Sequence, residues 1–458
     1  MIQTQHDQTR IAAGCLPQQR CRISPRALCS VSPRALSWAG ALFLSALALL
    51  PLRSLLARRP DVTPYVLPGI WSRRLRPTVP AACAREVHES WSVAVEYWTR
   101  GLAPGRSFAA AEFERLLGAG ASPELRQNAA DGVTVAVIIR NGSVFVIAPA
   151  PHGVVHDWTR QMLAFLGDAA RRYALPDAYF HLTCSDWQLQ PRSRAPLPGS
   201  LVLALNAGPA SWDVPIPGHS HPADGWLATD FPSFRWEDRR PVAHWRGNVM
   251  CESFGGDCAT RCTRIQLRLA AQRFPDLLDV RFTEANKDVS PCVAELIGHL
   301  PEVRDLSLQV SAVTPVAQVR AKFLVASSGT GTPSGLKRSL ANGAVVLREA
   351  SVFREYFEPA LVPWQAYVPF DCRDSDKDCR VLDIVRSAAE AGMDEHFRGI
   401  GARGQAFARS HFTAEARACY IFLLLQTLQP FFEGGTGALP DAVAARLLPR
   451  ARRFEQQA

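Results

Sequence analysis

The chain has 458 residues, of which 47% are hydrophobic and 20% charged. This composition is typical of a globular protein and excludes an intrinsically disordered one. Lysine and arginine (51) outnumber aspartate and glutamate (42), for a formal net charge of +9. Several of these arginines precede residue 35 and no stripe of basic and aromatic residues follows, so we expect no nucleic-acid partner. The length predicts about three domains, or about two and a targeting segment.

The N-terminal part of the chain carries the signals of a membrane anchor and a spacer. Residues 1–34 are basic and predict a cytosolic tail, and residues 35–57 begin with a long uncharged apolar run, Ala35 to Leu52. This run is just long enough to cross a bilayer, which favours a single-pass signal anchor of type II in the Golgi or endoplasmic reticulum. The alternative is an organelle transit peptide, because the N-terminus bears Arg and Ser and few acids. The proline-rich residues 58–85 predict an extended stem.

The cysteines favour disulfide bonds over a metal site. The chain has 12 cysteines, but no Cys-x-x-Cys pair and no histidine at zinc-finger spacing. Cys258 and Cys262, and likewise Cys372 and Cys379, are close enough in sequence to form local loops. We therefore expect disulfides in an oxidising lumen.

Residues 86–240 predict a first α/β domain. Two apolar runs flank Asn141-Gly142, which indicates a β-hairpin with a type I′ turn. Asn141 also begins an N-glycosylation motif, so the hairpin alone and a glycosylated hairpin both stay open. A helical pattern covers 158–173, and strand patterns cover 178–186 and 201–205.

A carboxylate ends the strand predicted at 178–186. Enzymes with α/β folds place catalytic groups where strands open into loops, so Asp186 is a candidate general base. A turn or capping residue is the alternative. The nearby loop histidines lack a third metal ligand at motif spacing, and we interpret them as solvated residues: His152, His156, His219 and His221.

Residues 241–432 predict a second α/β domain with a parallel sheet. A strand at 242–245 leads into Arg246-Gly247-Asn248, a helix over 261–274 and a strand at 277–282. Strand, loop, helix and strand then recur between Lys322 and Leu347, and repeated units of this kind bind ligands at the carboxyl ends of the strands. Three closing helices and a basic tail complete the chain, at 382–391, 397–411, 414–432 and 433–458.

The Gly-rich loop Ser327 to Gly335 is a candidate anion site. It lies between an apolar strand and a helix that begins at Leu336 and carries Lys337 and Arg338. Backbone N–H groups of such a loop, together with a lysine, favour a phosphate group. The loop is not a Walker motif, because no Gly-Lys-Ser/Thr triplet is present. A Gly-rich surface turn is the alternative.

Three stretches occur in the order seen in a known enzyme family. They are FHLTCSDW at 180–187, HWRG at 244–247, and KFLVASSGTGTPSGLKRSLANGAVVL with FREYFEPALVPWQAYVP between 322 and 369. In these motifs the chain resembles the Rumi-type protein O-glucosyltransferases, within the lipopolysaccharide-modifying, capsule-associated glycosyltransferase family 90. The resemblance covers about residues 170–430.

The resemblance implies an α/β fold of the GT-B type, with two Rossmann-like domains facing a cleft. The first domain would bind the acceptor and the second a UDP-sugar. Asp186 corresponds to the catalytic base of that family. The implied donor-binding residues are Arg246, Gly247, Asn248, Arg264, Thr330, Gly331, Thr332, Pro333, Ser334, Gly335 and Lys337. Such enzymes are expected to hold no permanent cofactor and no metal.

The chain also departs from the family pattern. The family's loop arginine corresponds to Gly335 here, its serine to Pro333, and the histidine of its Tyr-x-Pro motif to Ala366, while Arg338 is positioned to supply a nearby charge. The sequence therefore predicts a membrane-anchored glycosyltransferase that moves glucose or xylose from a UDP-sugar to a hydroxyl of a protein or glycan. The alternative is a catalytically inactive GT-B module that binds glycans or protein.

Overall fold

The computed structural model describes the following residues: 83–100, 102, 107–117, 123–147, 155–186, 199–208, 211–218, 234–248, 262–283, 320–329, 331–333, 335–351, 353–372, 380–390 and 392–454. The predictions for the tail, the anchor and nearly all of the stem lie outside these residues, as do those for His152, His219, His221, Thr330 and Ser334. Within the described part of the chain, no helix combines the length and the apolar character that a bilayer crossing requires.

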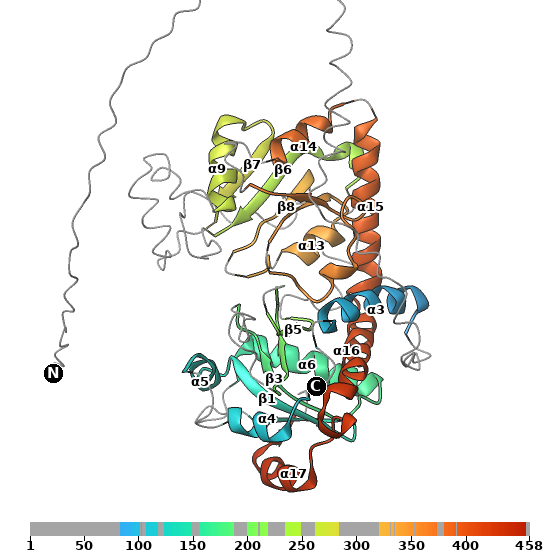
Figure 1. The fold of residues 1–458 in the computed structure, drawn as a ribbon. Coiled ribbons are helices and arrows are strands. Elements are labelled where there is room, and N and C mark those ends of the chain that lie inside the picture. Colours follow the sequence, from blue (N-terminus) through green and yellow to red (C-terminus); the bar gives the residue numbers. More distant parts are fainter. Residues whose placement is uncertain are drawn as a thin grey trace, which may run out of the picture. The chain divides into compact units, whose positions relative to one another are not determined.

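The first sheet is mixed and contains six strands in the order β11-β2-β1-β3-β4-β5 (Figure 1). Its strands are β1 (Thr134–Arg140), β2 (Ser143–Ile147), β3 (Ala178–Thr183), β4 (Val202–Ala204), β5 (Val214–Pro215) and β11 (Arg452–Arg453). The predicted hairpin is confirmed, because β1 and β2 pair antiparallel and Asn141 and Gly142 have φ values of 50° and 70°. From β3 to β5 the strands run parallel, so β3, β4 and β5 end at one edge of the sheet.

Helices cover this sheet: α3 (Arg85–Thr99), α4 (Ala110–Leu116), α5 (Pro123–Ala130), α6 (Asp157–Arg172), α16 (Ala414–Leu428) and α17 (Asp441–Leu447). Helix α16 packs on α6 and α3 and is buried almost all round, which confirms that its Tyr420–Leu425 run belongs to the core. The chain therefore returns to the first sheet after the second sheet is complete. Strand β11 does the same, because it pairs with β2.

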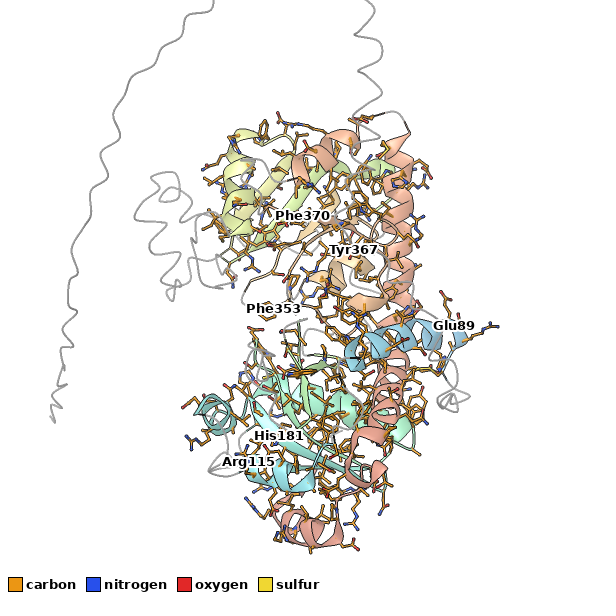
Figure 2. All side chains as sticks on the ribbon, viewed as in Figure 1. Glu89, Arg115, His181, Phe353, Tyr367 and Phe370 are labelled. Carbon is orange, nitrogen blue, oxygen red and sulfur yellow. A yellow bond between two sulfur atoms is a disulfide. The ribbon has the colours of Figure 1, made fainter. Side chains whose placement is uncertain are left out.

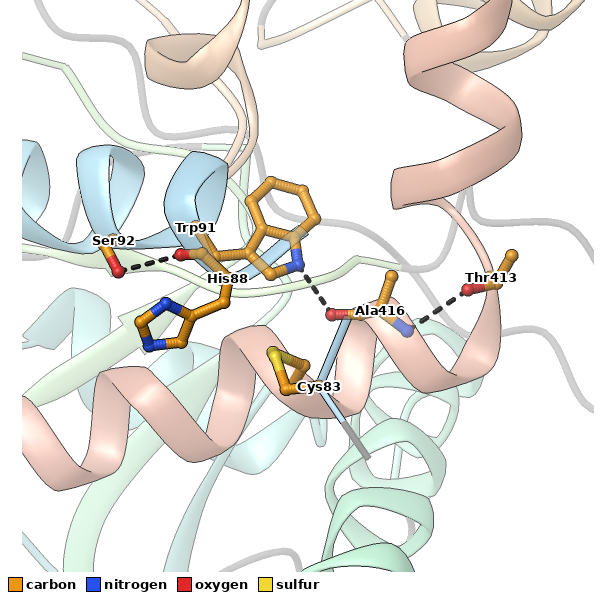
Figure 3. The surroundings of a disulfide bond; sticks show 7 residues. Cys83, His88, Trp91, Ser92, Thr413 and Ala416 are labelled. Atoms are coloured by element: carbon orange, nitrogen blue, oxygen red, sulfur yellow. Dashed lines mark hydrogen bonds between the residues drawn. A yellow bond between two sulfur atoms is a disulfide. The ribbon is translucent and has the colours of Figure 1, made fainter. Parts of the chain in front are cut away.

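A disulfide ties the start of the described chain to α16. Cys83 is bonded to Cys419, and near the bond Trp91 Nε1 donates to the carbonyl oxygen of Ala416 at 2.7 Å (Figure 3). Cys262 and Cys372 are also disulfide-bonded, whereas Cys184 is a buried free thiol. The expectation of disulfides is thus confirmed for these four cysteines.

The second sheet is wholly parallel, as the sequence predicted, and its strands have the order β10-β9-β8-β6-β7. Its strands are β6 (Arg240–Gly247), β7 (Leu278–Phe282), β8 (Ala321–Ala326), β9 (Val345–Glu349) and β10 (Val368–Phe370). Its helices are α9 (Thr263–Arg273), α13 (Leu336–Ala341), α14 (Val381–Ser387) and α15 (Met393–His411). Successive side chains of a strand point to opposite faces of the sheet. Phe323 of β8 and Val345 of β9 lie side by side and share a core cluster with residues of α9 and α14.

Short 3-10 turns connect these elements at Trp236–Asp238 (η1), Glu358–Ala360 (η2), Gln429–Phe431 (η3), Glu433–Gly435 (η4) and Leu448–Arg450 (η5). Ala207, just after β4, forms two backbone hydrogen bonds with Arg354, after β9, at 3.0 and 2.8 Å. The chain segments that follow one strand of each sheet are therefore bonded directly to each other. One apolar cluster continues across this junction and includes residues of α3, α13 and α16.

Two of the side chains labelled in Figure 2, His181 and Phe370, belong to strands and are buried. His181 of β3 is 2% exposed, and burial lowers its pKa to about 4, so it is a neutral core residue at pH 7. Phe370 of β10 and Phe353 are equally buried in the part of the chain around the second sheet.

Candidate active site at the ends of the two sheets

Asp186 lies just beyond the carboxyl end of β3 and is half-buried. The turn that carries it is shaped by Thr183, whose hydroxyl accepts a hydrogen bond from the Ser185 amide at 3.2 Å. Thr134 of β1 in turn donates its hydroxyl to Thr183 at 2.9 Å. The carboxylate is therefore presented from a strand end that hydrogen bonds hold in place.

Gly331 brings the Gly-rich loop onto this carboxylate. A methyl group on Gly331 would lie 2.8 Å from Asp186 Oδ1 and 3.2 Å from Asn206 Nδ2. Since Gly331 follows β8 and Asp186 follows β3, the loop of the second sheet and the strand end of the first sheet are in contact. The sequence predicted both residues for one site, and the structure brings them together.

The start of the loop is held by a buried carboxylate. Glu349, at the end of β9, accepts hydrogen bonds at 2.8 Å from the Ser327 hydroxyl and from the Ser328 amide, and also bonds the hydroxyl of Thr263 at the start of α9. Gly329 then donates its amide to the Gly331 carbonyl at 3.2 Å. The ends of β8 and β9 and the first turn of α9 are thus joined at one point.

Arg264 lies against this loop. Its guanidinium donates to Asn248 Oδ1 at 2.6 Å and to the Ser327 carbonyl at 3.1 Å, and lies 5.4 Å from the centre of the Trp245 ring. A methyl group on Gly329 would lie 2.9 Å from Arg264 Nη2. The structure therefore places Asn248, Arg264 and the loop side by side, as the resemblance implies for a diphosphate site.

Arg246 forms a buried ion pair with Asp279. Its guanidinium donates to Asp279 Oδ1 at 2.7 Å and to the Asp279 carbonyl at 2.6 Å, and its side chain is 6% exposed. His244 Nδ1 also donates to Asp279, at 3.2 Å. These hydrogen bonds, first that of His244 and then that of Arg246, hold the pKa of Asp279 well below its usual range. Arg246 is thus paired with a carboxylate of β7 that Arg240 and Arg281 also approach, at 3.4 and 3.5 Å.

Lys337 is buried as well. Its side chain is fully enclosed, and its ammonium group bonds the Glu355 carboxylate, which is also enclosed. Burial lowers the pKa of Lys337 and raises that of Glu355, and the ion pair opposes both shifts. The ammonium group therefore pairs with Glu355 and does not lie at the surface of the loop.

The remaining predicted residues differ in how much space surrounds them. A methyl group on Gly247 would lie 2.6 Å from the Trp245 ring, so this glycine is required for packing. Thr332 is half-buried and Pro333 is buried, and the Pro333 carbonyl accepts the Leu336 amide at 2.9 Å. Gly335 has an ordinary φ of −78°, and a methyl group there would meet nothing within 4 Å.

Two residues of this site were not singled out from the sequence. Asn206 follows the predicted strand at 201–205 just as Asp186 follows β3, and strands that run parallel end at one edge. Glu349 follows the apolar run Val345 to Leu347 in the same way. The usable signal in both cases is a polar residue at the carboxyl end of a buried strand.

Comparison with known proteins assigns this arrangement to a family. The family model described as Glycosyl transferase family 90 matches residues 111–433, which include Asp186, Arg264 and the whole Gly-rich loop. The chain belongs to glycosyl transferase family 90. Its membership confirms the resemblance found in the three sequence motifs.

Within the aligned regions, named relatives of this family 90 chain are about a quarter identical to it. Protein O-glucosyltransferase 2 of Danio rerio is 26% identical over 299 residues, which are 63% of this chain and 54% of the relative. Protein O-glucosyltransferase 3 of Mus musculus is 26% identical over 56% of this chain and 48% of the relative. Protein O-glucosyltransferase 1 of Homo sapiens is 23% identical, over 49% and 51%. The matched region thus spans about half the length of these relatives.

The buried pair predicts that Lys337 contributes to stability. Lys337→Met leaves the Glu355 carboxylate buried without its partner, so we expect the free energy of unfolding to fall by about 3–5 kcal/mol. The double variant Lys337→Met/Glu355→Leu removes both charges and should recover most of that loss. Urea denaturation measures both effects.

Arg338→Met is the matched control, because Arg338 is exposed on the same short helix and should change the unfolding free energy by less than about 0.5 kcal/mol. A Lys337→Met variant as stable as the parent chain would contradict the buried pair.

Proposed function

We propose that this chain is a glycosyltransferase that moves a sugar from a UDP-sugar to a hydroxyl of a protein or glycan. The observation that carries the proposal is the contact of Gly331 with Asp186, which joins a strand-end carboxylate to a Gly-rich loop. The relatives named protein O-glucosyltransferases support glucose as the sugar and a protein as the acceptor. Xylose is the second sugar that we propose to test.

In the proposed reaction, Asp186 accepts the proton of the acceptor hydroxyl. The acceptor oxygen forms a bond to the anomeric carbon of the sugar, and the bond from that carbon to the diphosphate oxygen breaks. UDP leaves with the electron pair of the broken bond. Arg264 and the backbone amides of the loop would stabilise the negative charge that develops on the diphosphate. The proposed mechanism uses these groups and no metal ion.

Three predicted donor-binding residues take different parts in this proposal. Arg264 contacts the donor directly. Arg246 would contact the donor only if its ion pair with Asp279 broke, and it otherwise holds β6 in place. Lys337 would contact the donor only if its ion pair with Glu355 broke, and it otherwise holds α13 in place. Thr330 and Ser334 are proposed donor contacts because of the family resemblance alone.

We propose the GT-B architecture for the two sheets, with the acceptor bound by residues 86–240 and the donor by residues 241–432. Two observations support this assignment, the parallel second sheet and the return of α16 to the first sheet. The membrane anchor at 35–57, its type II orientation and the Golgi or endoplasmic reticulum location stay predictions from the sequence, with an organelle as the alternative.

An inactive GT-B module that binds glycans or protein is the second candidate. The observation that favours it is the pairing of Lys337 with Glu355, together with Gly335 in the place of the family's loop arginine. Hydrolysis of UDP-glucose or UDP-xylose by the chain distinguishes the two candidates, since an inactive module releases no UDP above the spontaneous rate.

The proposed base predicts a separation of transfer from binding. Asp186→Asn retains the shape of the side chain but cannot accept the proton, so we expect sugar transfer to fall by about 10²–10⁴-fold. Affinity for UDP, measured by calorimetry, should not change. Asp238→Asn is the control, because Asp238 pairs with Arg235 at an exposed site and should leave transfer intact. Transfer by Asp186→Asn at the parental rate would show that Asp186 is not the base.

The proposed diphosphate contact predicts a loss of donor affinity. Hydrogen bonds to charged groups contribute about 1.5–3 kcal/mol, so Arg264→Ala should raise the dissociation constant for UDP by at least about tenfold. The matched control is Arg268→Ala, one helical turn further along α9, where the guanidinium bonds the Val280 carbonyl at 3.3 Å. Calorimetry that finds equal UDP affinity for the parent and Arg264→Ala would place the donor elsewhere.

A further inference from the structure

Asn206 emerges beside Asp186 at the same edge of the first sheet. Strands β3 and β4 are parallel, with Thr183 opposite Ala204, so the residues that follow them leave the sheet together. The backbone next to Asn206 is fixed by the two hydrogen bonds between Ala207 and Arg354. The backbone that leads out of Asn206 is therefore held in place.

The carboxamide of Asn206 is buried and unsatisfied. Asn206 is 2% exposed, and neither Oδ1 nor Nδ2 has a hydrogen-bond partner in the described part of the chain. Leaving a buried polar group without a partner is unfavourable, and most such groups in native proteins are paired. A group left unsatisfied beside a candidate base is therefore one whose partner we expect to be a ligand or an ordered water.

The direction of the carboxamide is toward the candidate active site. The methyl group imagined on Gly331 would touch Asn206 Nδ2 as well as Asp186 Oδ1. Gly331 thus covers both side chains in this structure. Any ligand group that reaches Asp186 by displacing Gly331 also meets the Asn206 amide.

We propose that Asn206 is a ligand-binding residue whose carboxamide hydrogen-bonds a sugar hydroxyl next to Asp186. A carboxamide offers an N–H donor and a C=O acceptor, and a hydroxyl both donates and accepts, so the two groups are complementary. The hydroxyl belongs either to the donor sugar or to the acceptor. This inference rests on the proposed function and assigns to Asn206 the recognition of one hydroxyl at the reacting centre.

The test pairs Asn206→Ala with ligands that lack one hydroxyl. UDP-glucose and its mono-deoxy analogues form the donor arm, and p-nitrophenyl β-glucoside and its mono-deoxy analogues form the acceptor arm. Affinities are measured by calorimetry and UDP release by a coupled assay, with the full chain. Asn342→Ala is the matched control, since Asn342 is also buried but its Oδ1 accepts from Arg239 at 2.8 Å.

We expect one deoxy ligand to bind the parent chain about tenfold more weakly than the complete ligand does. The Asn206→Ala variant should bind that deoxy ligand and the complete ligand equally, because the variant already lacks the hydrogen bond. The arm in which this happens identifies the hydroxyl as belonging to the donor or to the acceptor. Asn342→Ala should lower stability and keep the parental pattern of deoxy penalties.

Two results overturn the inference. In the first, Asn206→Ala binds every ligand with the affinity of the parent chain. The carboxamide would then be hydrogen-bonded to an ordered water and not to a ligand. In the second, no ligand of either arm binds the parent chain. Hydroxyl-dependent binding by the parent that is lost in Asn206→Ala, without any UDP release, would support the inference and contradict the proposed transferase.

Discussion

The Glu349 carboxylate is the interaction on which the arrangement of the candidate site depends. It is buried, and it binds the Ser327 hydroxyl, the Ser328 amide and the Thr263 hydroxyl. These partners end β8 and begin α9, so one side chain fixes where the loop leaves the sheet. Arg264, one residue beyond Thr263, is thereby placed beside Gly329, and Gly331 is placed over Asp186. This geometry adds the Gly331–Asp186 contact to the Ala207–Arg354 hydrogen bonds that also join the two sheets.

Two of the predicted cations are already paired with carboxylates before any ligand binds. Arg246 pairs with Asp279, and Lys337 pairs with Glu355, each inside the protein. Such pairs are strongly destabilised when one partner is lost, and they fix the positions of the elements that carry them. Arg264 lies at the loop itself, where it donates to Asn248 Oδ1 and to the Ser327 carbonyl. We therefore propose Arg264 as the cation that acts on a diphosphate.

Much of the fold was predictable from local patterns. The Asn141-Gly142 turn requires two residues with positive φ, and asparagine and glycine adopt this conformation most readily. The buried runs of the second sheet and the amphipathic helices between them indicated a parallel α/β unit, which the structure confirms. Asp186 and the Gly-rich loop were predicted for one site, and they are in contact.

Pairings between distant residues were not predictable in this way. Cys83 and Cys419 are 336 positions apart, and no sequence spacing indicates their bond. The helix pattern around Lys337 shows that α13 forms, but it does not show that Glu355 lies where the ammonium group is buried. Asn206 follows a predicted strand, but its position beside Asp186 arises from the parallel pairing of β3 and β4, which no local pattern specified.

The most direct test of the contact between the two strand ends compares sugar transfer by Gly331→Ala and Gly335→Ala. A methyl group at Gly331 would lie 2.8 Å from Asp186 Oδ1, whereas one at Gly335 meets nothing within 4 Å. We predict that Gly331→Ala lowers the rate of transfer from UDP-glucose at least about tenfold with an unchanged melting temperature, because the carboxylate or the loop has to move. Gly335→Ala keeps the backbone amide, which is the group that Gly335 could offer to a donor, and should therefore transfer at the parental rate. Equal rates for the two variants would contradict a site built from Asp186 and the Gly331 loop.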